Sequence, residues 1–75
     1  MKTKRHDEEA VRRIAAKFTA LREERGVFQK VVARETGLNI GLLETGSRNI
    51  TLYTIERLCR YYGITLTDFF RELEM

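Results

Sequence analysis

The chain of 75 residues contains no proline and no tryptophan, and it has one cysteine, Cys59, and one histidine, His6. A single cysteine cannot form an internal disulfide, and one cysteine with one histidine cannot build a cysteine-based metal site. A nucleophilic Cys59–His6 pair would lack the third group that orients the base, and no paired carboxylates suggest acid–base chemistry. The composition therefore predicts a protein without catalysis, cofactor or metal.

Long apolar runs are also missing. No segment approaches the roughly 20 apolar residues of a membrane span, and the N-terminal MKTKRHDEEA lacks the apolar centre of a signal peptide. We therefore expect a cytoplasmic protein with no membrane partner. The length suits one small domain that buries about 60% of its unfolded surface. With 43% hydrophobic and 33% charged residues, the chain is expected to fold rather than to be disordered.

The formal net charge is +3, and it is unevenly distributed. Residues 1–34 hold ten Lys or Arg against five Asp or Glu (10 − 5 = +5), whereas residues 35–75 hold four against six (4 − 6 = −2). A phosphate-containing partner would bind the basic half. Residues 1–6 are expected to be a flexible basic arm, and residues 7–75 a single domain. The alternative for Lys2, Lys4 and Arg5 is that they only keep a frayed tail soluble.

Helical periodicity and capping signals predict three helices in the first half of the chain. Asp7 can cap a first helix that runs to about Arg25, with Glu8 and Glu9 in its first turn. Its apolar positions are Ala10, Val11, Ile14, Phe18 and Leu21. A second helix is expected over 29–36. A third is expected over 40–45, with Asn39 as its cap and Gly46 as a left-handed exit.

Two more helices follow. Thr51 opens a fourth helix that ends before Gly63, and its apolar stripe comprises Leu52, Ile55, Leu58, Cys59 and Tyr62. At this spacing Cys59 is interpreted as a small buried hydrophobic residue. Thr65 with Asp68 resembles the capping box of a last short helix that carries Leu66, Phe69, Phe70 and Leu73. With no strand alternation or repeat, the five helices predict a compact all-α domain.

The segment QKVVARETGLNIGLLETGSRN, residues 29–49, is typical of a helix-turn-helix unit with its core at 29–45. Gln29 and Ala33 share one face of the second helix, and Gly37 lies just beyond the helix end. Ala33 has almost no side chain, so a helix that begins near Asn39 can cross it closely and project its outer face. A projecting helix of this kind suits a DNA groove.

Taken together, these segments resemble the XRE family, the Cro and phage-repressor class of helix-turn-helix proteins. The residues that carry the resemblance are LREERG at 21–26, Gln29, Val32, Ala33, Gly37, Glu44, Gly46, Arg48 and LYTIERLCRYYGITLTDFF at 52–70. The resemblance covers nearly all of residues 18–73. It implies a five-helix lambda-repressor-like domain that binds double-stranded DNA.

The resemblance also implies roles for individual residues. Gln29 would touch the sugar-phosphate backbone, with Lys30 extending the same edge, and Arg22 would pair with Glu44. After the third helix, Ser47, Arg48 and Asn49 form a polar set suited to phosphate contacts, as the basic chemistry of Arg48 also favours. The alternatives are an ordinary solvated helix start at Gln29 and a plain loop at 48–49.

Two departures from the family pattern stand out. Phe28 occupies the N-cap position of the second helix, where the family usually has Ser or Thr. From Gly37 to Glu44 there are about three residues fewer than the common pattern, so the recognition helix is shortened. Of its groove-facing residues only Asn39 has a side chain suited to hydrogen bonds with base edges. Asn39 either caps the helix only, or caps it and also reaches a base. Gly41 would allow close backbone approach, and Leu42 would contact a thymine methyl or a protein partner.

The sequence therefore predicts a DNA-binding transcriptional regulator that acts as a symmetric homodimer on a two-fold operator. Because apolar residues crowd the last helix, we expect a dimer interface that includes Tyr61, Phe69, Phe70 and Leu73, with Met75 adjacent. The alternative is that Leu66 and Phe69 pack inward. A rival function is a protein-interaction or antitoxin-like module on the same scaffold, with weak or no base reading, whose Leu42 or Phe69 face binds another protein.

Overall fold

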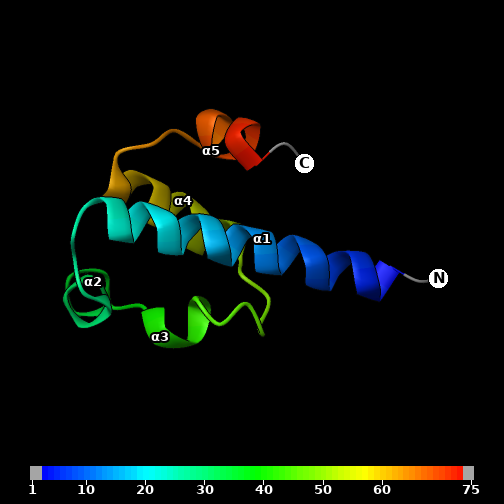
Figure 1. The fold of residues 1–75 in the computed structure, drawn as a ribbon, viewed down its shortest axis with the longest axis horizontal. Coiled ribbons are helices and arrows are strands. Elements are labelled where there is room, and N and C mark those ends of the chain that lie inside the picture. The colour runs from blue at the N-terminus through cyan, green and yellow to red at the C-terminus, as the bar shows by residue number, and fades with distance from the viewer. Residues whose placement is uncertain (1–2, 74–75) are drawn as a thin grey trace.

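The computed structural model describes the backbone of residues 3–73 and the side chains of residues 8–73. This part of the chain forms five helices and no strand: α1 (Thr3–Glu24), α2 (Gln29–Thr36), α3 (Ile40–Leu43), α4 (Leu52–Tyr62) and α5 (Leu66–Leu73). The all-α prediction is thus confirmed. α1 is a long rod through the middle of the molecule, with α5 on one side of it and α2 and α3 on the other (Figure 1).

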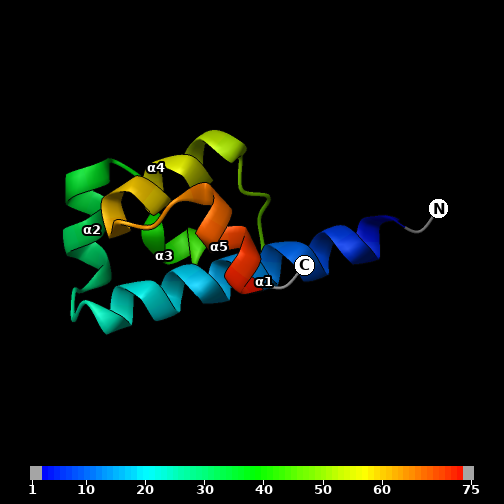
Figure 2. The same cartoon turned by 90° about the horizontal axis from the view of Figure 1, so that it is seen from above.

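α1 begins earlier than the sequence suggested. It starts at Thr3, so the expected cap at Asp7 is wrong: Asp7 lies inside the helix, and the first turn contains no acidic residue. Residues 3–6 include no glycine or proline that would stop a helix. Of the expected arm, residues 1 and 2 lie outside the described residues, and residues 3–6 belong to α1. The N-terminal turns of α1 extend beyond the other helices (Figure 2).

The segment after α3 turns sharply and passes close to α1. α3 ends at Leu43, two residues before the expected end at Thr45, because the chain tightens: the Thr45 and Gly46 N–H groups donate to the carbonyls three residues back. Gly46 adopts φ +72°, the left-handed conformation expected of it. A Cβ at Gly46 would lie 3.2 Å from Arg12 Cα, so the loop needs glycine for space as well as for conformation.

The hydrophobic core lies between α1 and the other four helices. At its centre the rings of Phe18 and Phe69 stack with centroids 4.6 Å apart. Its buried members are Ile14, Phe18, Leu21, Val32, Ile40, Ile55, Leu58, Cys59, Tyr62, Phe69 and Leu73. The burial of Cys59 was expected. The prediction that Leu52 belongs to the buried stripe of α4 is wrong. Leu52 is 65% exposed, because it is the first residue of α4 and the buried stripe starts only at Ile55.

Side chains of α1 and of the turn that follows it hold the C-terminal ends of α5 and α4. The Arg13 guanidinium donates to the carbonyl of Leu73, and the Arg25 guanidinium donates to the carbonyl of Tyr62. Lys17 adds an ion pair with Glu72. Cations at helix C-termini satisfy free carbonyls and oppose the negative end of the helix dipole. The C-terminal helix is therefore fixed to the long rod at two places, Arg13 and Lys17.

No helix within residues 3–73 combines the length and the apolar character needed to cross a membrane.

Candidate nucleic-acid interface

α2 and α3 form a compact unit joined by a short turn. Gly37 ends α2 with φ +76°, and its N–H donates to the carbonyl of Ala33 at 2.8 Å. Val32 of α2 and Ile40 of α3 are fully buried and anchor both helices to the core. With only four residues, α3 is about 6 Å long. It lies on the side of the molecule opposite α5 (Figure 1).

Asn39 has the capping role that the sequence predicted. Its Oδ1 accepts from the backbone N–H of Leu42 at 3.0 Å, which uses one of the two acceptor positions of that oxygen, and the amide NH₂ group of Asn39 can donate to a partner. Leu42 is 37% exposed on the outer side of α3. The outer surface of α3 therefore offers one amide donor and one apolar side chain, which is little for reading base edges.

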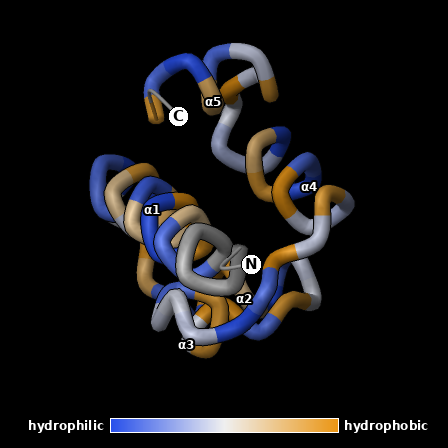
Figure 3. Tube along the Cα trace, turned by 90° about the vertical axis from the view of Figure 1, so that its right-hand side faces the viewer, coloured by the Kyte–Doolittle hydropathy of each residue, from blue (hydrophilic) through white to orange (hydrophobic). Residues whose placement is uncertain are grey.

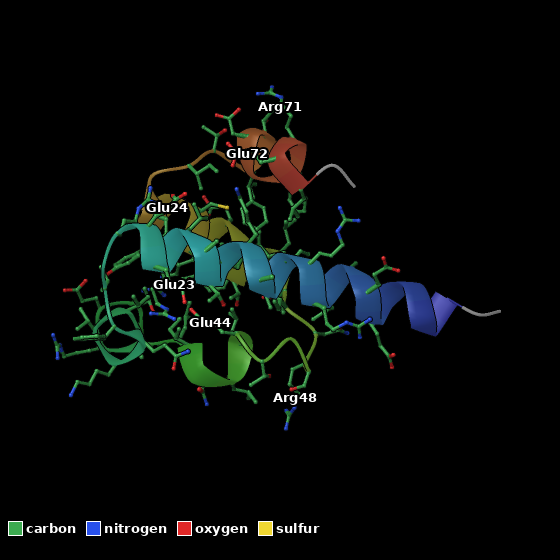
Figure 4. All side chains as sticks on the ribbon, viewed as in Figure 1. Glu23, Glu24, Glu44, Arg48, Arg71 and Glu72 are labelled. Atoms are coloured by element: carbon green, nitrogen blue, oxygen red, sulfur yellow. The ribbon has the colours of Figure 1, made fainter. Side chains whose placement is uncertain are left out.

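An ion pair fixes the end of α3 to α1. Arg22 Nε lies 2.8 Å from Glu44 Oε2, and Arg22 Nη2 lies 3.0 Å from Glu44 Oε1, which is the bidentate geometry of strong charge-assisted pairs. Arg22 also donates through Nη1 to the carbonyl of Val27 at 2.9 Å. Glu44 lies between α1 and α3 (Figure 4). The pair that the family resemblance implies is thus formed, and it holds α3 at a fixed place beside α1.

The electrostatics of the pair agree with this geometry. Burial alone would raise the pKa of Glu44, but hydrogen bonds from Arg22 and Gln29, together with the charge of Arg22, lower the pKa below its ordinary value. Hydrogen bonding to Glu44 in turn raises the pKa of Arg22. The side chains are 13% and 5% exposed, respectively, so both groups stay ionised in a mostly buried place.

The first turn of α2 lies beside α3. Gln29 Nε2 donates to Glu44 Oε1 at 2.8 Å, so the ion pair also orients this amide. A Cβ at Gly41 would lie 3.6 Å from Gln29 Oε1 and 3.9 Å from Asn39 Oδ1. Three of the residues singled out in the sequence, Gln29, Asn39 and Gly41, are therefore neighbours, and Lys30 follows on the exposed surface of α2.

Phe28 leaves the start of α2 without a side-chain cap. It sits at the N-cap position with extended backbone, makes no capping hydrogen bond, and is 72% exposed. The first backbone N–H groups of a helix have no partner within the helix, and its N-terminus carries partial positive charge. The uncapped start of α2, at Gln29 and Lys30, therefore presents donors suited to an anion such as phosphate.

The loop after α3 provides the second set of polar groups. Ser47 is held by Thr45: the two side-chain oxygens are 2.7 Å apart, and the Ser47 N–H donates to Thr45 Oγ1 at 3.2 Å. Arg48 points away from the body of the molecule (Figure 4) and pairs with no carboxylate among residues 8–73. A hollow of about 180 Å³ is lined by Leu38, Asn39, Leu42, Leu43, Arg48, Asn49, Ile50, Thr51 and Thr54. Arg48 and Asn49 thus share one surface with α3.

Sequence reasoning missed Arg12. This exposed residue of α1 lies against the loop, since a Cβ at Gly46 would be 3.3 Å from Arg12 Cγ. The fold thereby places the base of the Arg12 side chain against the loop that carries Ser47 and Arg48. Arg12 and Gly46 are far apart in the chain, and no local pattern links them, so only the packing of the loop on α1 reveals the contact.

The basic half of the chain is less available than its composition suggested. Arg13 and Arg25 bind backbone carbonyls, whereas Lys17 and Arg22 bind carboxylates. These four cations stabilise the fold. The cations of residues 8–34 that remain for a phosphate partner are Arg12, Lys30 and Arg34, which are all exposed.

The expected dimer residues separate into two groups. Phe69 and Leu73 are buried in the core of a single chain, at 0% and 8% exposure, so their assignment to a dimer interface is wrong. Spacing of four residues puts both on the face of α5 that packs inward. Phe70 is 36% exposed, and Tyr61 is half-buried with its hydroxyl donating to Glu35 at 2.5 Å. Met75 lies outside the described residues.

The polar groups therefore form one connected surface, which runs from the start of α2 over α3 to the loop beside Arg12. Within residues 8–73 no cluster of three metal-binding side chains occurs. Neither a protein family nor a curated protein or solved structure matches this chain. Amide donors, cations and a helix start can bind phosphate groups, and this is the chemistry that the surface offers.

Proposed function

We propose that this protein is a cytoplasmic, DNA-binding transcriptional regulator of the XRE family, with a lambda-repressor-like helix-turn-helix fold, which binds double-stranded DNA as a homodimer. The observation that carries the proposal is the connected surface on the side opposite α5. There α3 lies between two phosphate-binding elements, the start of α2 with Gln29 and Lys30, and the loop with Ser47, Arg48 and Asn49.

In this proposal most of the affinity comes from phosphate contacts. The uncapped amides of α2 and the side chains of Lys30, Arg48 and Arg12 bind the backbone on either side of a groove. The Arg22–Glu44 pair holds α3 at the groove, where Asn39, Gly41 and Leu42 face the bases. Because α3 offers so few base-reading groups, sequence preference depends largely on the shape and deformability of the DNA.

A protein-interaction module is the second candidate function. It is favoured by the exposed Leu42 and by the hollow beside it, whose floor includes Leu38 and Ile50. In this reading the surface of α3 binds a side chain of another protein, as in an antitoxin-like partner, and DNA binding is weak or absent.

Binding of duplex DNA at several salt concentrations distinguishes the two functions. Fluorescence anisotropy with a pool of random duplexes should show tight binding at low salt that weakens steeply as salt rises, because counterions are released from the DNA. Arg48→Ala should weaken binding to all sequences alike and reduce the slope of log K against log salt by about one unit.

Arg71→Ala is the matched control, since Arg71 is a surface arginine of α5, on the opposite side, and pairs with Asp68. It should leave the slope unchanged. Absence of binding at low salt would refute the DNA-binding function and leave the protein-interaction module. If Arg48→Ala affected only some sequences, Arg48 would contact a base and the assigned phosphate role would be wrong.

A further inference from the structure

Two large apolar side chains are exposed at the start of α4. Leu52 and Tyr53 are each 65% exposed, although they are the first two residues of a helix whose other face is buried. Tyr53 also lines a shallow hollow of about 330 Å³, together with Glu35, Thr36, Glu56, Arg57, Arg60 and Tyr61. We call Leu52, Tyr53 and the residues that line this hollow the α4 patch.

The α4 patch contains residue types that often dominate the binding energy between proteins, namely two tyrosines and two arginines. Tyrosine and arginine are the residue types most enriched among the side chains that dominate binding energy between proteins. Tyr53 is held in place by Arg57, whose Nη1 donates to its hydroxyl at 3.3 Å, and Tyr61 is held by Glu35. A side chain that is already ordered loses less freedom when a partner binds.

The charges of the α4 patch balance each other. Glu35 and Glu56 carry two negative charges, and Arg57 and Arg60 carry two positive charges. A surface of one sign would repel a second copy of itself, whereas a balanced surface can face its own copy with opposite charges opposed. A two-fold contact requires this self-complementarity, because the same residues are present on both sides.

The position of the α4 patch suits a DNA-binding dimer. α4 forms one side of the molecule, between α5 and α3, which lie on opposite sides (Figure 3). A two-fold axis that lies beside α4 and runs parallel to the line from α5 to α3 would leave both α3 helices on the same face of the pair.

We propose that the α4 patch binds a second copy of this chain, with Leu52 and Tyr53 of each copy at the centre of a two-fold contact; this inference rests on the DNA-binding function proposed above. The described part of the chain measures 39 × 23 × 20 Å. For two such bodies side by side to contact successive turns of one duplex, their α3 helices must lie about one DNA turn, or about 34 Å, apart. Of the dimer residues expected from sequence, this contact includes Tyr61 but none of those in α5.

Sedimentation of three proteins tests the location of the contact. The wild type should be a dimer, and Tyr53→Glu should raise its dissociation constant roughly 30-fold or more, as expected when a central interface side chain is lost. Phe70→Glu is the control on α5 and should change the constant less than about threefold. At a concentration low enough for the wild type to be monomeric as well, Tyr53→Glu should have the same helical circular dichroism and the same thermal midpoint as the wild type, because Tyr53 is exposed.

Cysteine cross-linking provides a second measurement. Cys59 is buried, so Tyr53→Cys and Phe70→Cys each add one accessible thiol to the chain. Under oxidation, Tyr53→Cys should form covalent dimers faster than Phe70→Cys. A wild type that stays monomeric at high concentration, or a dimer that Phe70→Glu disrupts and Tyr53→Glu does not, would overturn the inference.

The DNA assay keeps the two proposals separate. If the wild type binds duplex DNA but sediments as a monomer, the dimer contact is refuted and the DNA-binding function stands. If Tyr53→Glu abolishes dimers of a protein that binds no duplex DNA, the contact is supported and the DNA-binding function fails.

Discussion

Replacing Glu44 by glutamine removes one charge from the centre of the interface and barely changes the volume of the side chain. Arg22 would then lose the attraction of the negative charge and one of the two hydrogen bonds at 2.8 and 3.0 Å, because an amide has only one accepting oxygen, and it would keep its bond to the carbonyl of Val27. The remaining cation would lie in a place where its side chain is only 13% exposed. The variant is therefore expected to be clearly less stable than the wild type.

The size of the loss follows from the burial of the pair. Breaking a fully buried ion pair costs about 3–5 kcal/mol, whereas exposed pairs contribute about 0–1 kcal/mol. With Arg22 slightly accessible and Glu44 almost fully buried, we expect Glu44→Gln to lower the free energy of unfolding by about 3 kcal/mol. Glu72→Gln is the matched control: it removes the ion pair with Lys17, but Glu72 is half exposed, so the loss should stay below about 1 kcal/mol.

Urea denaturation, followed by circular dichroism over a range of pH, measures how much stability Glu44→Gln loses and whether the charge of Glu44 is the cause. Since the pKa of Glu44 is lower in the folded protein than its ordinary value of 4.5, its contribution is complete above that value and is lost as the pH falls through the folded pKa. The stability gap between wild type and Glu44→Gln should thus be constant near neutral pH and shrink below pH 4.5. A gap no larger than that of Glu72→Gln, or one that widens in acid, would refute the reasoning.

Two further predictions concern the loop and the buried thiol. Gly46→Ala should lower the free energy of unfolding by about 1 kcal/mol more than Gly63→Ala. Both glycines have positive φ, but a Cβ would meet Arg12 at Gly46 and nothing within 4 Å at Gly63. Equal losses in urea denaturation would contradict this prediction. Burial, with a smaller effect of Glu56, raises the pKa of Cys59 to about 11 from 9.0. Near pH 8 an alkylating reagent should therefore modify this thiol about 100-fold more slowly in the folded than in the unfolded protein. Similar rates would show that the thiol is accessible.

Much of the helical framework could be predicted from local signals. Glycine at 37 and at 63 ends a helix where the apolar spacing stops, and Asn39 and Thr51 cap helices through side-chain hydrogen bonds. Each of these features depends on a few consecutive residues, which is why the sequence is sufficient. The start of α1 was harder to predict, because Asp7 is a good capping residue but no residue of 3–6 prevents the helix from beginning earlier.

Features that depend on the packing of distant segments could not be predicted in the same way. Leu52 fits the periodic stripe of α4, yet it lies before the helix reaches the core. Phe69 and Phe70 are adjacent in sequence, but the position of α5 across α1 buries one and exposes the other. The contact of Arg12 with the loop at Gly46 has no local signal at all. The Arg22–Glu44 pair could be predicted only because the family resemblance implied it.

The stacking of Phe18 on Phe69 also has a consequence for synthesis of the chain. These rings come from the first and the last helix, and Arg13 closes the same contact by binding the carbonyl of Leu73. A nascent chain exposes Phe18 long before its partner has been made, so the core cannot close until α5 has left the ribosome. During translation the apolar face of α1 must therefore wait until α5 has been made, and a chain truncated before Phe69 would keep an open core.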